Sequence, residues 1–421
     1  MRTDGTAGGG GGPGGPAPGP GSAGDTGSVL AWVLERSHDA SAEDLSELVE
    51  EAARRLDLGA ARLYLADVQQ AHLIALPHSP ASRPQTRDAA GDRVLDVEGS
   101  LAGLAYRTES VQRARDTGTL WIPMIDGVER VGVMRASPAP GTDPLAAAGA
   151  LASLATLLVV SKSPHNELLT TAQRTRPMSL QAELLWAFLP PRTIGTRQAT
   201  SSAVLEPAYD IGGDAFDHTF TDGLLHLTML DAMGHDLASG GASATALAGC
   251  RSTRRTGGSL SDIVTTIDRT LEEWVPGRLL TAVFANLDTH DGEFTWINCG
   301  HPPPLLIRDG HVLPAALERS AQPPLGFGFH TPPHPPPAQH RVRLQPGDRV
   351  LFYSDGVTEA RSAGGELFGE ARLADTVIRS MASGVNAPEA LRRLIQNLLT
   401  HQDQRLNDDA TILLAEWHPE H

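Results

Sequence analysis

The chain has 421 residues, of which 40% are hydrophobic and 5% aromatic, and its formal net charge is −16. This charge argues against nucleic acid and anionic membranes as partners, because both attract clustered Lys and Arg. The two cysteines, Cys250 and Cys299, exclude a disulfide framework and a cysteine-rich zinc site. We find no signal peptide and no uninterrupted apolar run long enough to span a bilayer, so we expect a cytoplasmic protein.

The first part of the chain divides into a tail and a folded domain. Residues 1–27 are mostly Gly, Pro, Ala and Ser, a composition that predicts a disordered tail. Apolar residues then recur at helical spacing, and Ser41 with Asp44 resembles a capping box. The expected elements are helices at 41–56, 101–106 and 145–160, strands at 60–66 and 72–76, and a hairpin of 120–124 and 128–135 across Asp126-Gly127. Helices around an antiparallel sheet make residues 28–162 an α+β domain.

The order of these elements resembles a GAF-type sensory domain. The resemblance is carried by the stretch EGSLAGLAYRT and by the hairpin LWIPMIDGVERVGVMRAS with its following helix, and it covers residues 28–160. It implies a small-molecule ligand, although the Cys or His pattern of a covalent chromophore or haem site is missing. An unrelated α+β domain remains the alternative.

Residues 163–192 are predicted to form a helical linker. Apolar residues recur between polar ones, and a helix ending at the run LPP fits because Pro190 and Pro191 cannot continue it. Such a helix could pair with its copy in a homodimer, or it could pack on its own domain. The sequence leaves both open, and we predict dimerisation through this region and the first domain.

From residue 193 to 421, strands and helices alternate with turn signals. The expected strands cover 224–231, 281–288, 294–299, 305–308, 311–313, 349–353 and 410–417, and the expected helices cover 243–255, 260–274, 367–381 and 388–401. Many hairpins combined with helices of this length predict two stacked antiparallel sheets with helices outside, an α+β fold of αββα type.

Four aspartates stand where apolar strands meet loops. Asp214 lies in the run DIGGDAFD and Asp231 opens DAMGHD after LLHLTML, while Asp355 follows RVLFY and Asp408 precedes DATILLAEW. Each one alone is as well explained by a turn, where Asp before Gly is common. Strand-end carboxylates can converge on one edge of a sheet, and oxygen-only ligands select Mg²⁺ or Mn²⁺. Two such ions can activate a shared water and clamp a phosphoryl group.

The ordered runs of residues 187–417 resemble the PPM-type metal-dependent protein serine/threonine phosphatases, in the bacterial branch of sporulation and sigma-regulating phosphatases. The matching runs are FLPP at 188–191, EPAYDIGGDAFD at 206–217, LDAMGHD at 230–236, LLTAVFANLDTHDGEFTWINCGHPPPLLI at 279–307, PLGF at 324–327, LQPGDRVLFYSDGVTEAR at 344–361, GELFGEARL at 365–373 and NDDATILL at 407–414. Their order over half the chain is specific, whereas any single run is not.

The resemblance implies hydrolysis of phosphoserine or phosphothreonine on a protein, with two Mn²⁺ or Mg²⁺ ions. Carried over by motif, Asp214 and Asp231 lie nearest both ions and the carbonyl of Ala232 is a ligand. Asp355 and Asp408 complete the shell of one ion, and Asp409 stays open as a further ligand. The usual substrate in this branch is a phosphorylated anti-anti-sigma factor.

The sequence departs from the family pattern at Ala215, where an aromatic residue is common, and at Asp236, where Gly is common. Neither change removes a ligand, but Asp236 adds negative charge that we expect to affect metal affinity or substrate approach. His235 could be a general acid, although a role in shaping the loop is favoured, and His301 is expected to be structural. No functional role is expected for the remaining candidates. We expect a flexible surface loop to contain His330, His334 and His340, and a solvated helix end to contain Arg251, Arg254 and Arg255.

Three functions compete at this point. The first is an active phosphatase controlled by an N-terminal sensor. The second is a protein that binds a phosphoprotein without turnover, against which the four retained aspartates argue. The third is a ligand sensor in which the first domain carries the main function.

Overall fold

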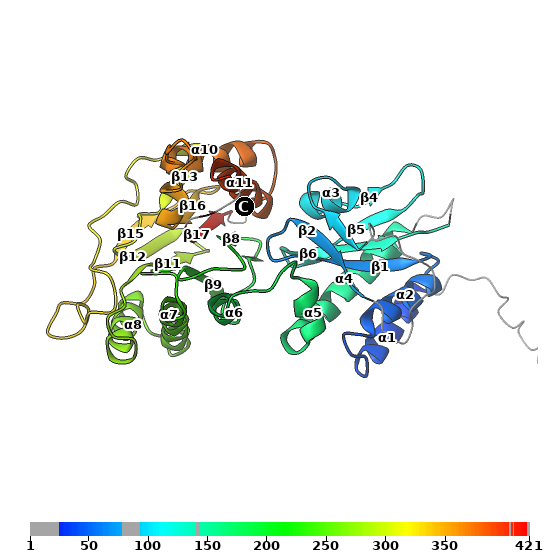
Figure 1. The fold of residues 1–421 in the computed structure, drawn as a ribbon, viewed down its shortest axis with the longest axis horizontal. Helices are drawn as coiled ribbons and strands as arrows, with labels where there is room; N and C mark the ends of the chain where they lie inside the picture. Colours follow the sequence, from blue (N-terminus) through cyan, green and yellow to red (C-terminus); the bar gives the residue numbers. More distant parts are fainter. Residues whose placement is uncertain (1–24, 78–92, 140–143, 404–405, 407, 419–421) are drawn as a thin grey trace, which may run out of the picture.

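The computed structural model describes residues 25–77, 93–139, 144–403, 406 and 408–418, which form two domains (Figure 1). The tail predicted at 1–27 therefore lies outside the described residues except for its end, where a helix already begins at Thr26. Most of the stretch between the strand expected at 72–76 and the helix expected at 101–106 that precedes residue 93, and Asn407 of the last motif, also lie outside them.

The first domain is a six-stranded antiparallel sheet in the order β3-β2-β1-β6-β5-β4. Alternate residues of β1 point to opposite faces: Leu63 and Leu65 join the core under α1, α2 and α4, whereas Tyr64 packs on the other face with Tyr106 of α3. The bounds are α1 Thr26–Ser37, α2 Leu45–Arg55, β1 Ala61–Ala66, β2 His72–Ala75, β3 Val94–Asp96, α3 Leu101–Thr108, β4 Gln112–Arg113, β5 Leu120–Asp126, β6 Glu129–Ala136 and α4 Leu145–Lys162. The α+β character expected for this region is observed.

Helix α2 begins later than the sequence predicts. Both the backbone N–H and the hydroxyl of Ser41 donate to Oδ2 of Asp44, each at 2.8 Å. These bonds close a turn that ends where the helix starts, at Leu45. The pattern read as the start of the helix therefore belongs to the turn before it.

The segment Leu145–His165, which contains α4, is long and apolar enough to cross a membrane by length and composition alone, with a mean hydropathy of 1.8. A core helix meets the same criterion. Leu151, Leu158 and Val159 of α4 are buried in the core of the first domain, so α4 has a packing role that accounts for its composition.

The linker contains three short helical pieces, not one long helix: η3 (Ser163–His165), α5 (Glu167–Ala172) and α6 (Leu180–Trp186). Leu169 of α5 is buried in the core of the first domain, whereas Ala182 and Leu185 of α6 are buried in that of the second. Each linker helix therefore packs on a domain of its own chain: α5 on the first and α6 on the second.

The second domain is a sandwich of two antiparallel sheets, with strand orders β15-β12-β11-β10-β9 and β14-β13-β16-β17-β8-β7. Helices α7 and α8 cover the first sheet and α10 and α11 cover the second (Figure 1), which confirms the αββα prediction. The bounds are β7 Thr193–Gly195, β8 Ala199–Glu206, β9 Ala215–Thr221, β10 Leu224–Ala232, α7 Leu237–Arg255, α8 Leu260–Trp274, β11 Leu280–Asp288, β12 Glu293–Cys299, β13 Leu305–Arg308, β14 His311–Val312, β15 His340–Arg343, β16 Arg349–Tyr353, α9 Asp355–Thr358, α10 Gly369–Ala382, α11 Ala387–His401 and β17 Ala410–Trp417.

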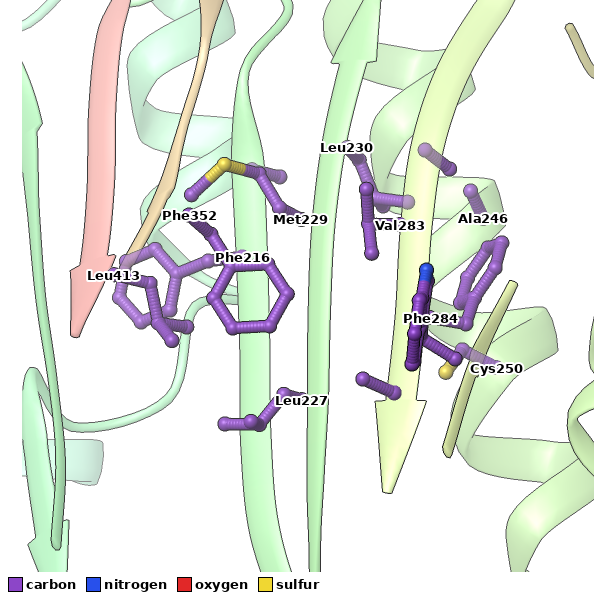
Figure 2. Close-up of a cluster of buried hydrophobic side chains, with 14 of the residues drawn as sticks. Phe216, Leu227, Met229, Leu230, Ala246, Cys250, Val283, Phe284, Phe352 and Leu413 are labelled. Atoms are coloured by element: carbon purple, nitrogen blue, oxygen red, sulfur yellow. The ribbon is translucent and has the colours of Figure 1, made fainter. Parts of the chain in front are cut away.

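The core between the sheets is built from one face of each strand (Figure 2). Phe216 of β9 and Met229 of β10 lie toward Phe352 of β16 and Leu413 of β17. Thr228, one residue away from Met229, turns to the opposite face and contacts Cys250 of α7. This alternation fixes which strand-end residues can face the gap between the sheets.

The two domains meet through buried polar contacts. Arg130 of β6 and Glu389 of α11 form an ion pair of 3.3 Å, and their side chains are 2% and 1% exposed. Arg392 of α11 also pairs with Glu389, at 2.8 Å, and it contacts Glu98 of the first domain. Buried charges are costly without partners, so these pairs favour one specific relative placement of the domains.

Candidate active site

The candidate site lies where strands of both sheets end, and side-chain alternation brings its residues to the same gap. Asp231 shares the inward face of β10 with Met229, and Asp214 precedes β9 in phase with Phe216. On the opposite sheet, Asp409 is in phase with Leu413 of β17 and Ser354 is in phase with Phe352 of β16; both stand next to the ends of their strands. Residues spaced by two along a strand share a face, so all four positions point between the sheets.

Asp214 and Asp231 are neighbours on adjacent strands. Leu230 pairs with Ala215 in the antiparallel register of β10 and β9, so the next pair outward is Asp231 with Asp214. Gly213 makes this approach possible, since a Cβ there would lie 2.3 Å from the carbonyl oxygen of Ala232. The hydroxyl of Ser243, from α7, donates to the carbonyl of Gly213. The loop before Asp214 is thus fastened to the end of β10.

Asp355 and Asp408 form the other side of the site, and both are exposed. Asp355 opens α9, and the Gly356 that follows packs directly on the last motif: a Cβ at Gly356 would lie 2.0 Å from the carbonyl oxygen of Asp409. The Asp-Gly pair is therefore more than a turn signal, because only glycine permits this contact.

Asp409 is buried and differs from its neighbour. Its Oδ2 accepts hydrogen bonds from the backbone N–H groups of Gly212, Gly213 and Asp214 at 2.9, 2.7 and 3.1 Å. Asp408 receives the N–H of Asp409 on Oδ1 at 2.9 Å. The two adjacent carboxylates therefore face different surroundings.

Burial, and after it mutual repulsion, raises the pKa of three of these carboxylates. Burial and the carboxylates of Asp231 and Asp409 raise the pKa of Asp214 well above its usual range. Burial, with the carboxylates of Asp355, Asp408 and Asp409, raises the pKa of Asp231 to about 7. Burial and Asp408 also raise the pKa of Asp355. Such a concentration of acidic groups is relieved by a bound cation.

The donor set fits a hard divalent cation. Every candidate ligand is an oxygen, and Oδ2 of Asp214 is buried without a hydrogen-bond partner, as expected of an atom that binds a metal. The carbonyl of Ala232 borders the same loop. Among the residues that the structure describes, no three Asp, Glu, His or Cys side chains form a ready-made metal cage. Mg²⁺ commonly keeps several waters, so waters would complete such a site.

The negative charge that Asp236 adds is balanced within its own surroundings by an arginine. Its carboxylate caps α7 by accepting the N–H of Ser239 at 2.9 Å and pairs with Arg278 at 2.7 Å. The N–H of Ser239 and the guanidinium of Arg278 lower the pKa of Asp236 to about 2. Arg278 also donates to the carbonyl of Met233. Asp236 and Arg278 together therefore hold the loop after Asp231 in place.

Two of the three arginines at the end of α7, Arg251 and Arg254, are not solvated, which corrects the interpretation from sequence; Arg255 is exposed, as expected. Arg251 and Arg254 both pair with the buried carboxylate of Asp217, at 2.7 and 2.8 Å. Asp217 lies on β9 in the opposite phase to Phe216, so it faces α7. This ion cluster stands on the outer face of the sheet, away from the gap between the sheets.

The histidines also differ from one another. His301 is buried, with Nδ1 at 3.0 Å from the hydroxyl of Thr281, which agrees with a structural role. His235 is exposed, and its Cα packs against Gly212. His330 is buried and its backbone N–H donates to Asp268, and His340 begins β15, whereas His334 is exposed, as expected of a surface loop.

Several residues at the site escaped prediction from sequence. Ser354 accepts the N–H of Thr411 on its hydroxyl at 2.9 Å, which ties β16 to β17 beside Asp214. Strands β8 and β9 were also not assigned. The run SDG marks Ser354 as a turn residue, and the alternation in ATILL predicts a strand that contains Thr411. Neither pattern indicates that the Ser354 hydroxyl contacts the N–H of Thr411 across the sheet.

Comparison with known proteins matches residues 221–418 to the family described as Stage II sporulation protein E (SpoIIE). Protein IcfG of Synechocystis is 28% identical over 137 residues, 32% of this chain and 20% of IcfG. Phosphoserine phosphatase RsbU of Bacillus subtilis is 24% identical over 213 residues, 50% of this chain and 61% of RsbU. The chain therefore spans less than two thirds of either relative. Among solved structures, the RsbU and RsbW domains of Rv1364c from Mycobacterium tuberculosis are similar with a TM-score of 0.45 and 27% identity, covering 53% of this chain and 62% of that one.

Proposed function

Since the C-terminal domain belongs to the SpoIIE-type PP2C phosphatases, we propose that this chain hydrolyses phosphoserine or phosphothreonine on a regulatory protein in a metal-dependent reaction. Two observations support the proposal: Asp214 and Asp231 lie side by side at the ends of adjacent strands, and the carboxylates of Asp355 and Asp408 act on Asp231 by charge. The proposal includes two Mn²⁺ or Mg²⁺ ions.

In this proposal the carboxylates of Asp214, Asp231, Asp355 and Asp408, with the carbonyl of Ala232, hold the ions. Bound divalent ions supply a water of lowered pKa and neutralise charge on the phosphoryl oxygens. The chain's own contribution is rigidity: Gly213 and Gly356 allow close backbone contacts, and Ser243 fixes the loop before Asp214. Both cysteines are buried, and burial raises the pKa of each thiol, so neither suits a thiolate nucleophile.

The substrate proposed here is a phosphorylated protein of the anti-anti-sigma type, and the first domain is proposed to be a GAF-like sensor that regulates the second. Polar, buried contacts between the domains support such regulation, because a movement of one domain would break or shift bonds to the other. A cytoplasmic homodimer completes the proposal. Light scattering of the full chain tests it, and a monomer would refute the dimer.

The activity is tested with p-nitrophenyl phosphate and Mn²⁺. We expect metal-dependent turnover by the natural protein and a loss of at least 100-fold in Asp231→Asn. Asp375→Asn is the matched control, because Asp375 is an exposed aspartate of the same domain that pairs with Arg379 on α10. The control should retain full turnover.

The competing function is phosphoprotein binding without turnover. It predicts no metal-dependent release of p-nitrophenol by the natural protein and identical behaviour of Asp231→Asn. That pair of results would reject the phosphatase proposal and leave the binding protein.

A further inference from the structure

Asp409 occupies a backbone cradle in the loop that precedes β9. Three successive N–H groups, from Gly212 to Asp214, point at its carboxylate, and Gly212 bonds both oxygens, at 2.9 and 3.1 Å. Successive N–H groups of this kind form an anion-binding concavity. Here the anion is a side chain 197 positions away from Gly212, and it is 9% exposed.

The same residue also contacts the third motif. The hydroxyl of Ser354 lies 3.3 Å from the carbonyl oxygen of Asp409, and Gly356 is pressed against that carbonyl. The N–H of Asp409 donates to Oδ1 of Asp408. Asp409 therefore contacts the segments that carry Asp214, Asp355 and Asp408.

We propose that Asp409 is a positioning residue and not a metal ligand: it holds the Asp214 loop against the Asp355–Gly356 turn. The inference rests on the proposed metal site. A carboxylate has about four lone-pair positions, and those of Asp409 are directed at N–H groups. Binding an ion through it would leave buried N–H donors without an acceptor.

Its neighbours have the complementary character. Oδ2 of Asp214 is buried without a partner, and Asp408 is exposed. Two adjacent aspartates of one motif thus have different roles: Asp408 is the ligand, and Asp409 fixes the backbone from which Asp214 projects.

The test compares Asp409→Asn with Asp408→Asn in the full chain, with Asp375→Asn as control. In EDTA we expect Asp409→Asn to lower the midpoint of thermal unfolding by about 5 °C, because an amide group faces N–H donors. Asp408→Asn should leave the midpoint unchanged or raise it, since it removes repulsion with Asp355.

Mn²⁺ titration at a temperature where both variants are folded gives the second readout. We expect Asp409→Asn to bind as many ions as the natural protein with about tenfold weaker affinity, a loss typical of groups that orient ligands. Turnover of p-nitrophenyl phosphate should recover at saturating Mn²⁺. Asp408→Asn should bind fewer ions and should not recover.

The inference is overturned if Asp409→Asn keeps the thermal midpoint in EDTA and loses a bound ion as Asp408→Asn does. Failure of the natural protein to bind Mn²⁺ would instead reject the proposed function. The order of the thermal midpoints in EDTA would then still decide whether Asp409 anchors the loop.

Discussion

Nε2 of Gln69 in the first domain donates a 2.9 Å hydrogen bond to Oε2 of Glu206 in the second. Glu206 ends β8 and pairs there with Ala410 of β17, the residue directly after Asp409. The same Oε2 accepts the N–H of Ala208, at the start of the loop that leads to Asp214. One contact between the domains therefore reaches the strand ends that carry the candidate site.

Loss of the Gln69–Glu206 hydrogen bond should lower the affinity of the candidate site for Mn²⁺. In Gln69→Ala the buried Glu206 loses a donor, which destabilises the protein by about 1–3 kcal/mol. We expect the Mn²⁺ concentration for half-maximal p-nitrophenyl phosphate turnover to rise severalfold. Asn386→Ala is the control, because Asn386 contacts Glu109 across the same domain boundary but lies at the start of α11. Equal shifts in both variants would contradict a specific route through Glu206.

Glu206 should also make stability depend on pH. Burial raises its pKa from 4.5 to about 7, so the folded protein holds a proton that the unfolded chain releases. The free energy of unfolding is therefore highest below pH 4.5 as far as this group is concerned, and it falls as pH rises through 7, by about 3 kcal/mol in total. Urea unfolding between pH 5 and 8 measures the fall. Glu206→Gln should remove the part of this fall that Glu206 causes and leave the part due to Asp231, whose pKa is also raised to about 7. An unchanged slope would rule Glu206 out as a source.

Asp355→Asn should separate metal binding from folding. Asp355 is exposed and repelled by Asp408, so the free energy of unfolding in EDTA should change by less than about 0.5 kcal/mol. Mn²⁺ affinity should fall at least tenfold in calorimetric titration. Glu359→Gln is the matched control, because Glu359 acts on Asp355 by charge without being a proposed ligand. Unfolding of Asp355→Asn at ordinary temperature would show that Asp355 is mainly structural.

Asp236→Ala should affect stability more than metal binding. The substitution removes the cap of α7 and the partner of Arg278, so thermal unfolding should shift down by about 2–4 °C. Because Arg278 balances the charge of Asp236, we expect Mn²⁺ affinity within about twofold of the natural protein. A large gain in affinity would mean that Asp236 does repel the ions.

Local pattern was sufficient for much of the fold. The apolar periodicity placed α8 at its observed bounds, and the pair Asp126-Gly127 marked the hairpin of β5 and β6. Turn chemistry and side-chain alternation depend on residues close in sequence, which is why these elements were predictable. The same reasoning placed Asp231 at the end of a strand and Asp355 directly after one.

Predictions failed where a residue's partner is distant in sequence. For the linker, the sequence left open whether its helix pairs with a copy or packs on its own domain; Leu169 and Leu185 are buried in different domains. Arg251 was expected at a solvated helix end, but its guanidinium pairs with Asp217 of β9. In each case a single sequence gives the residue type but not the neighbour that the fold brings to it.

Local sequence is enough to place aspartates at the ends of strands in an αββα domain, because period-two alternation and Asp-Gly turns depend on neighbouring residues. It does not indicate that Asp408 is exposed while Asp409 fills a cradle of N–H groups, which follows from the packing of the fold. The two residues are chemically identical and adjacent. Their difference comes from the loop of Gly212 and Gly213, which the packing of two sheets brings against one of them.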